Sequence, residues 1–207
     1  LDTHPHGTIS MHDGLVRSCN AYFAQLAVKL GPEPLLALAA RLGIPLARDA
    51  AHSPQRVRET LPQVGYGQAE VVASPLRMAS VAAAVAANGR LHEPYVEESL
   101  AGVSRSEQLV DPDIARRLGG YMRDVVLSGT GRSLRGHQGQ IAGKTGTAEV
   151  ANGPSHGWFV GFAPYGPAKK RIAFAIVVEH AGYGGATAAP AAGEIVTAAI
   201  DAGLIGK

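Results

Sequence analysis

The chain has 207 residues, a hydrophobic fraction of 46% and a formal net charge of +2. This composition is typical of a globular protein with one substantial core, and it argues against a disordered chain. The small net charge, the lack of Lys or Arg runs and an aromatic content of 5% argue against nucleic-acid binding, and a single cysteine excludes an internal disulfide.

The first predicted helix covers residues 21–30, where apolar residues recur at helical spacing before Gly31 and Pro32 end the pattern. Ser18 and Asn20 stand just ahead of this helix, where either residue type is a good N-cap. A second interpretation is that Ser18 points its hydroxyl into a cleft to relay a proton, while the Asn20 amide holds a peptide carbonyl. The residues alone leave both interpretations open.

Further helices are predicted by cap signals, in which Asp or Ser precedes a Pro at the first helical position, and by apolar periodicity. They are expected at residues 34–42, 75–87, 112–127 and 190–202. A strand is expected at residues 91–100, and the span from 44 to 62 is expected to be irregular and without catalytic motifs.

The second half of the chain predicts three strands, at residues 139–150, 156–164 and 171–179. Because short turns join them, they are expected to form an antiparallel meander. The last helix is expected to cover one face of this sheet. The first strand contains Lys144, Thr145 and Gly146, and its small residues predict an exposed sheet edge to which a peptide can add.

The Lys144-Thr145-Gly146 triplet has the residue types that bind a carboxylate and an acyl group. Lys144 supplies a cation and Thr145 a hydroxyl that orients a carboxylate, while Gly146 lets a ligand approach the backbone. The backbone N–H of Thr147 is a donor for a developing oxyanion. A triplet of this kind also occurs as an ordinary strand end, so the interpretation depends on other segments of the chain.

Three other segments accompany the triplet. They are a Ser18-Cys19-Asn20 element followed by Phe23, a Gly65-Tyr66-Gly67-Gln68 element that runs into Ser74-Pro75-Leu76, and a Trp158-Phe159-Val160-Gly161-Phe162 strand. With them, the chain resembles the later part of a penicillin-binding transpeptidase domain. That serine acyltransferase group combines Lys-Thr-Gly with a Ser-x-x-Lys motif. Tyr66 and Ser74 are small departures from the family pattern.

The resemblance implies an α+β fold, with an antiparallel sheet flanked by helices and a mainly helical lobe facing it across a cleft. Residues 1–207 would be the C-terminal part of a single transpeptidase domain. The implied activity is D,D-transpeptidation through a serine acyl-enzyme that β-lactams trap. The expected catalytic residues are Ser18, Lys144 and Thr147, and the expected substrate-binding residues are Asn20, Thr145 and Gly146.

The resemblance implies no cofactor, and the eight histidines show no metal-ligand spacing. The expected ligands are peptidoglycan stem peptides ending in D-Ala-D-Ala and β-lactam antibiotics. The expected protein partners are the upstream part of the same polypeptide and other cell-wall synthesis or division proteins. The expected location is the extracytoplasmic face of the bacterial membrane, with an anchor outside these residues.

The nucleophile motif is missing, because no serine stands three residues before a lysine anywhere in the chain. Either Ser-x-x-Lys lies ahead of Leu1, which would make the fold incomplete at its N-terminus, or the chain is a degenerate relative that binds without reacting. The start at Leu1 and the retained motifs favour the first explanation. The alternatives are a D,D-carboxypeptidase, a β-lactamase of the same fold, and a non-catalytic scaffold module.

Overall fold

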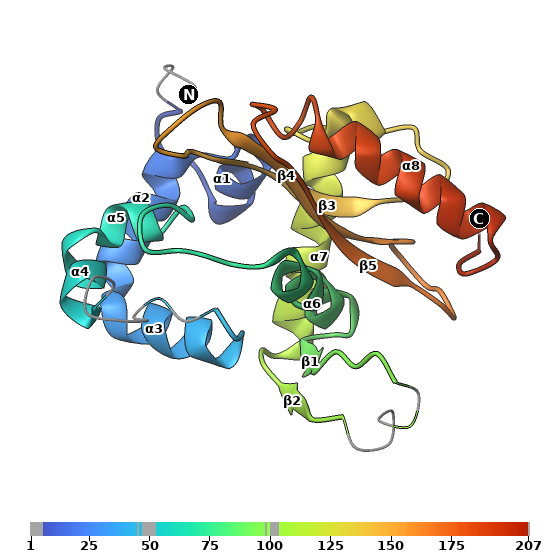
Figure 1. Cartoon of the computed structure of the whole chain (residues 1–207), viewed down its shortest axis with the longest axis horizontal. Coiled ribbons are helices and arrows are strands. Elements are labelled where there is room, and N and C mark those ends of the chain that lie inside the picture. The colour runs from blue at the N-terminus through green and yellow to red at the C-terminus, as the bar shows by residue number, and fades with distance from the viewer. Residues whose placement is uncertain (1–5, 45, 47–52, 98, 100–103, 207) are drawn as a thin grey trace. The chain divides into compact units, whose positions relative to one another are not determined.

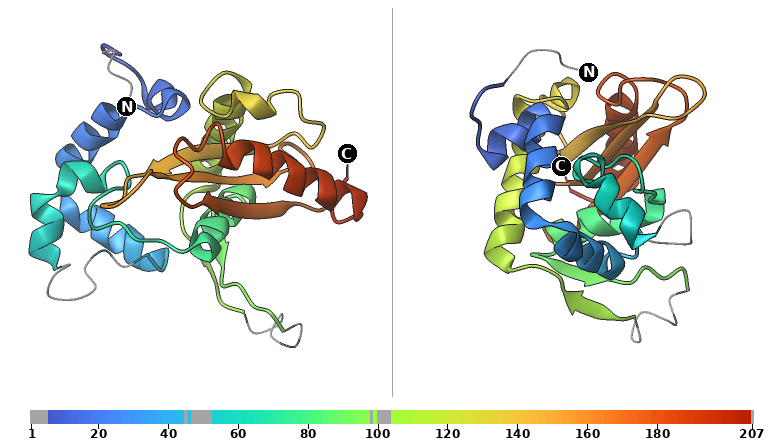
Figure 2. Two further views of the ribbon diagram at one scale, coloured as in Figure 1. Left: turned by 45° about the horizontal axis from the view of Figure 1, so that its top comes forward. Right: turned by 90° about the vertical axis from the view of Figure 1, so that its left-hand side faces the viewer.

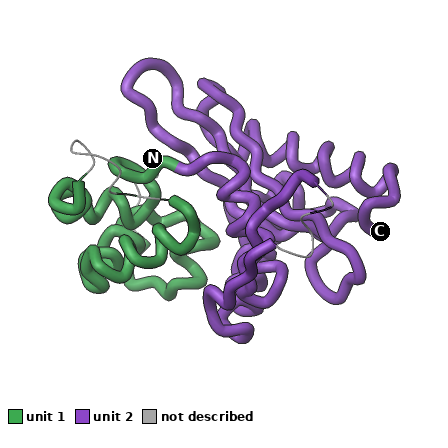
Figure 3. The backbone as a smooth tube through the Cα atoms, turned by 60° about the horizontal axis from the view of Figure 1, so that its bottom comes forward, with its two compact units in different colours: residues 1–72 green, residues 73–207 purple. Residues whose placement is uncertain are grey.

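The computed structural model describes residues 6–44, 46, 53–97, 99 and 104–206. The chain divides into two compact units, Leu1–Val72 and Ala73–Lys207, which Figure 3 shows in different colours. Each unit is described by itself below.

The regular secondary structure among the described residues of unit 1 is entirely helical. Its helices are α1 (Met11–Arg17), α2 (Asn20–Leu30), α3 (Pro32–Arg41), α4 (Pro54–Glu59) and α5 (Leu61–Val64). The chain packs closely where α5 ends, because a Cβ on Gly65 would lie 2.6 Å from the carbonyl oxygen of Phe23 and from the Cβ of Ala27. Glycine at position 65 therefore lets α2 and the end of α5 come together.

The structure confirms the helix predicted at residues 21–30 and places the next one two residues early, at α3. The prediction of an irregular span from 44 to 62 is wrong for its second part, where α4 begins and α5 follows. The Ser53 hydroxyl accepts a hydrogen bond from the Arg56 backbone N–H and caps α4. Ser53 followed by Pro54 is thus the start signal for α4. Residues 45 and 47–52 of this span lie outside the described residues.

Unit 2 contains a three-stranded antiparallel sheet, a small two-stranded ladder and the longer helices. The sheet order is β3 (Ala142–Ala148), β4 (His156–Ala163) and β5 (Ile172–Val178), which confirms the predicted meander. The helices and the ladder strands are α6 (Pro75–Ala86), β1 (Arg90–His92), β2 (Ser106–Gln108), α7 (Pro112–Leu127), the 3-10 turn η2 (Arg132–Leu134) and α8 (Ala188–Asp201).

Helices cover both faces of the sheet, as Figure 1 and Figure 2 show. On one face, Phe159 and Phe174 pack against small residues of α8, including Ala192 and Val196. On the other face, Phe162 of β4 packs with Met122 of α7. The alternation of side chains along each strand separates these two layers. The prediction that the last helix covers one sheet face is therefore confirmed.

The strand predicted at residues 91–100 is wrong in its length. Strand β1 covers only Arg90–His92 and pairs with β2, with Leu91 opposite Glu107. Pro94 has no N–H to donate, and it ends the ladder two residues after β1. Residues 98 and 100 of the predicted strand lie outside the described part of the chain.

Candidate active site

Strand β3 carries four of the six predicted site residues. It lies at one edge of the sheet, and along its whole length it pairs with β4, with Lys144 opposite Val160 and Gly146 opposite Trp158. Among the described residues, no other strand pairs with its outer edge. Arg123 of α7 donates a hydrogen bond of 2.7 Å to the carbonyl of Ile141, just ahead of β3. Arg123 therefore ties α7 to the start of β3, and β4 holds one edge of the strand.

Lys144 is a partly buried cation. Its Nζ donates a hydrogen bond of 2.8 Å to the backbone carbonyl of Thr145 and lies 3.5 Å from the Thr145 hydroxyl. Desolvation by burial lowers the pKa of Lys144 from 10.5 to about 8, because the charged form loses hydration inside the protein. At neutral pH this ammonium stays charged and is poorly hydrated, which favours pairing with an anionic ligand.

Thr145 is almost fully buried, with 5% of its surface exposed. Its Oγ1 lies 2.5 Å from the Oγ1 of Thr130, which belongs to the loop after α7. Thr130 is not among the site residues predicted from the sequence. The only signal was a threonine between two glycines, and its contact with Thr145 depends on the tertiary fold.

Glycines bring the loop before α8 against β3. A Cβ on Gly184 would collide with the carbonyl oxygen of Gly146 and lie 2.5 Å from that of Trp158. The N–H of Gly184 also donates a hydrogen bond of 3.4 Å to the Thr147 hydroxyl. The role predicted for Thr147 falls on its backbone N–H, and it stays a prediction because this hydrogen bond involves only the hydroxyl.

Gly146 has a packing role in addition to the predicted one. A Cβ at this position would lie 3.0 Å from the Cβ of Trp158 on the neighbouring strand. This distance is shorter than an ordinary contact between carbon atoms. A side chain at position 146 would therefore displace Trp158 as well as cover the backbone.

Ser18 and Asn20 lie at the junction of α1 and α2, in unit 1. Ser18 follows α1 in a left-handed conformation (φ 57°, ψ 49°), and Asn20 is the first residue of α2. The N-cap of α2 is Cys19, whose side chain makes no capping hydrogen bond. The capping interpretation of Ser18 and Asn20 is therefore wrong.

Both residues keep an exposed side, while Cys19 between them is buried. A left-handed serine costs about 1–2 kcal/mol relative to a right-handed one. Strained residues of this kind are found preferentially at functional sites. The roles predicted for Ser18 and Asn20, and their convergence on Lys144, stay predictions.

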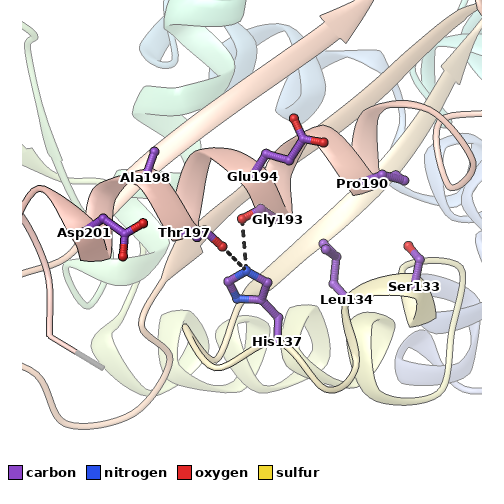
Figure 4. A pocket seen from close by; sticks show the side chains of 9 residues that line it. All are labelled: Ser133, Leu134, His137, Pro190, Gly193, Glu194, Thr197, Ala198 and Asp201. Atoms are coloured by element: carbon purple, nitrogen blue, oxygen red, sulfur yellow. Dashed lines mark hydrogen bonds between the residues drawn. The ribbon is translucent and has the colours of Figure 1, made fainter.

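A separate hollow lies between η2 and α8 and contains none of the predicted site residues (Figure 4). In it, His137 Nε2 lies 2.9 Å from the carbonyl oxygen of Gly193 and 3.0 Å from the Thr197 hydroxyl. His137 Nδ1 accepts a hydrogen bond from the N–H of Gly139. These bonds tie the segment before β3 to α8, so we assign the histidine a structural role.

The described residues contain no group of three or more His, Cys, Asp or Glu side chains that could hold a metal ion. None of the described helices combines the length and the apolar character that crossing a bilayer requires.

An α+β unit with a Lys-Thr-Gly edge strand is typical of serine acyltransferases that bind penicillin. The chain belongs to the family of the penicillin binding protein transpeptidase domain, whose model matches residues 2–197. The resemblance inferred from the motifs is therefore confirmed, and so is the α+β fold class.

Two relatives share this family over most of the chain. The peptidoglycan D,D-transpeptidase PbpA of Mycolicibacterium smegmatis is 32% identical over 228 residues, which cover 96% of this chain and 45% of that protein. The peptidoglycan D,D-transpeptidase MrdA of Acinetobacter baumannii is 31% identical over 227 residues, which cover 88% of this chain and 33% of that protein. The chain thus spans less than half the length of these relatives.

Solved structures show the same arrangement of elements. Penicillin-binding protein A from M. tuberculosis, as an imipenem acyl-enzyme complex, superposes with a TM-score of 0.77 at 30% identity, covering 96% of this chain and 48% of that one. The D,D-transpeptidase domain of a peptidoglycan glycosyltransferase from Eggerthella lenta gives a TM-score of 0.75 at 26% identity, covering 96% of this chain and 55% of that one.

Proposed function

We propose that the chain is the C-terminal part of one domain of a peptidoglycan D,D-transpeptidase that cross-links stem peptides through a serine acyl-enzyme. The observation that carries the proposal is the partly buried Lys144 ammonium beside Thr145 and Gly146 on an edge strand. The names of the relatives support the same activity.

The proposed reaction transfers an acyl group in two steps. A serine hydroxyl attacks the carbonyl of the penultimate D-Ala, and the terminal D-Ala leaves as an amine that takes up a proton. The amine of a second stem peptide then attacks the ester, forms the cross-linking amide and returns the proton to the serine. The serine belongs to a Ser-x-x-Lys motif that these 207 residues lack, so we place it in an upstream segment of the same polypeptide.

Each site residue has a distinct proposed role. Lys144 and Thr145 hold the terminal carboxylate, and Gly146 leaves room for the ligand. Thr147 lies two residues beyond Thr145 on β3, so its N–H faces the same edge as the Thr145 carbonyl that accepts from Lys144. This orientation supports Thr147 N–H as one donor to the oxyanion.

Ser18 and Asn20 have proposed roles in the same reaction. The Ser18 hydroxyl relays the proton, and the Asn20 amide fixes the acyl side chain. We further propose that the enzyme acts on the extracytoplasmic side of the bacterial membrane, held by an anchor outside these residues. A structural relative belongs to a peptidoglycan synthase complex, which supports other cell-wall synthesis proteins as partners.

Labelling with a fluorescent penicillin tests the proposal. The protein for this test is the full polypeptide, meaning this chain joined to the segment with its Ser-x-x-Lys motif. We expect a covalent label on the full polypeptide and none on the 207-residue chain, which lacks the nucleophile. The absence of label on the full polypeptide would instead favour a scaffold module.

The lifetime of the acyl-enzyme separates the proposed activity from hydrolysis. Intact mass spectrometry after a penicillin pulse should show an adduct that persists, because a transpeptidase reserves deacylation for an amine acceptor. Rapid loss of the adduct in water would favour a β-lactamase. Release of D-Ala from a stem peptide without cross-linked product would favour a D,D-carboxypeptidase.

A further inference from the structure

Thr130 is the residue outside the predicted set that contacts the proposed carboxylate site most directly. Its Oγ1 lies 2.5 Å from the Oγ1 of Thr145, and either hydroxyl can be the donor. Hydroxyl groups have one proton and two acceptor positions each, so one of the pair can donate to the other and still accept a bond. The contact therefore links the direction of the Thr145 proton to Thr130.

Few groups other than Thr130 can orient the Thr145 hydroxyl. Thr145 is only 5% exposed, so solvent competes little for its hydroxyl, and the Lys144 ammonium lies on the donor side at 3.5 Å. If Thr130 donates to Thr145, the proton of the Thr145 hydroxyl points away from the Thr130 hydroxyl and from the Lys144 ammonium. That proton is then available to a carboxylate, and the hydrogen bond from Thr130 strengthens it through polarisation.

The Thr130 loop is fixed by its own backbone. The N–H groups of Gly129 and Gly131 both donate to the carbonyl of Val125, at 3.1 and 3.0 Å, and Val125 is fully buried. These bonds fold the loop back onto the end of α7, so the Thr130 backbone is anchored to the core. A residue held in this way is suited to orient a partner.

Two consecutive glycines, Gly184 and Gly185, let the loop before α8 pack against the segments on both sides of the contact between Thr130 and Thr145. A Cβ on Gly185 would lie 2.7 Å from the Thr130 carbonyl oxygen, and a Cβ on Gly184 would collide with the Gly146 carbonyl. The loop before α8 therefore packs against Thr130 and against the Lys-Thr-Gly strand at once. This packing limits how far the two threonines can separate.

We propose that Thr130 is a positioning residue for the carboxylate site: its hydroxyl orients the Thr145 hydroxyl toward the carboxylate of the ligand. The inference rests on the proposed function, because it assigns Thr145 to that carboxylate. It adds a specificity element that acts only on ligands with a free carboxylate.

The test compares benzylpenicillin with its methyl ester, which lacks the carboxylate, as acylating agents of the full polypeptide. Thr130→Val keeps the shape of the side chain and removes the hydroxyl, and it should slow acylation by benzylpenicillin about tenfold, the effect of one hydrogen bond to a charged group. Acylation by the ester should change less than twofold. Thr130→Ser keeps a hydroxyl and should restore the benzylpenicillin rate to within about threefold.

Thr60→Val is a matched control, because Thr60 is also partly buried and its hydroxyl makes one hydrogen bond, to the Arg56 carbonyl. It should leave the ratio of the acid and ester rates unchanged. Equal slowing of acid and ester by Thr130→Val would show a general structural role and overturn the inference. So would an unchanged acid rate.

Thr145→Val separates this inference from the proposed function. If Thr145→Val lowers the acid-to-ester ratio and Thr130→Val does not, Thr145 binds the carboxylate and only the role of Thr130 is wrong. If neither variant lowers the ratio, the carboxylate assignment of Thr145 also fails. If both lower it, the double variant should be no slower than Thr145→Val, since Thr130 acts through Thr145.

Discussion

The Nζ of Lys144 lies 2.8 Å from the carbonyl oxygen of Thr145, the next residue on the same strand. The ammonium is thus turned along the edge of β3 rather than extended into solvent. The same burial that holds it there lowers its pKa to about 8. The charge that we assign to carboxylate binding is therefore present at neutral pH and lost at mildly alkaline pH.

Carboxylate recognition should weaken as the pH rises through about 8, where Lys144 loses its proton. The acid-to-ester ratio of acylation rates for benzylpenicillin and its methyl ester should fall above this pH, by up to about tenfold per pH unit. Groups that titrate in this range and affect acylation by the acid and by the ester equally leave this ratio unchanged. A ratio that stays constant from pH 7 to pH 10 would contradict the assignment of Lys144.

Replacing Lys144 by methionine should stabilise the fold while removing carboxylate recognition. The folded-state pKa is lower than the unfolded value, so the unfolded chain binds more protons between about pH 8 and 10.5 and stability rises with pH in that range. Below pH 8 the full cost of burying the charge is present. We expect Lys144→Met to raise the free energy of unfolding at pH 7 by about 2 kcal/mol, after allowing for residual exposure and the lost hydrogen bond to Thr145.

Urea unfolding of the full polypeptide at pH 7 and pH 10.5 measures this effect. The stability difference between Lys144→Met and the natural sequence should shrink toward the higher pH, because the natural lysine is then neutral in the folded state and only about half protonated in the unfolded state, so most of the cost of burying the charge is gone. A variant that is less stable at pH 7 would show that desolvation of Lys144 is not the dominant effect.

Gly184→Ala should lower both stability and acylation. The new methyl group would collide with the Gly146 carbonyl and crowd the backbone of Trp158, so β3 or the loop before α8 must shift. We expect a loss of about 1–3 kcal/mol in the free energy of unfolding, which is typical of overpacking. Gly136→Ala is the matched control, since a Cβ there meets no atom within 4 Å, and it should change stability little. Equal effects of the two substitutions would argue against close packing at Gly184.

The sheet was predictable because its signals are local. β4 and β5 are runs of apolar residues with β-branched and aromatic members, and turn-rich segments join the strands, so the meander follows from the sequence. α1 was not predicted from apolar periodicity. Its signal is a capping box. The Ser10 hydroxyl accepts a hydrogen bond from the Asp13 backbone N–H, and the Asp13 carboxylate accepts one from the Ser10 backbone N–H.

The candidate site was predictable only in part. Lys144, Thr145 and Gly146 are neighbours in the sequence, so their sharing an edge follows from the strand itself. The contact between Thr130 and Thr145 joins residues 15 positions apart and depends on how α7 packs against β3. The lowered pKa of Lys144 likewise results from tertiary burial, which no short motif encodes. The triplet therefore predicts the type of ligand that the site binds, whereas the pKa of Lys144 and the contacts of Thr145 depend on the tertiary fold.

Ser18 offers a test that separates backbone strain from catalysis, because glycine and alanine both remove its hydroxyl but only glycine adopts its left-handed conformation freely. We expect both Ser18→Ala and Ser18→Gly to slow acylation of the full polypeptide by penicillin about 100-fold or more, as loss of a proton relay requires. Ser18→Gly should be more stable to urea than Ser18→Ala by about 1 kcal/mol, since alanine keeps the strain. Equal stability of the two variants would contradict the left-handed conformation of Ser18. Near-normal acylation in both variants would exclude Ser18 from the proton relay, and it would not affect the roles proposed for Lys144 and Thr145 in binding the carboxylate.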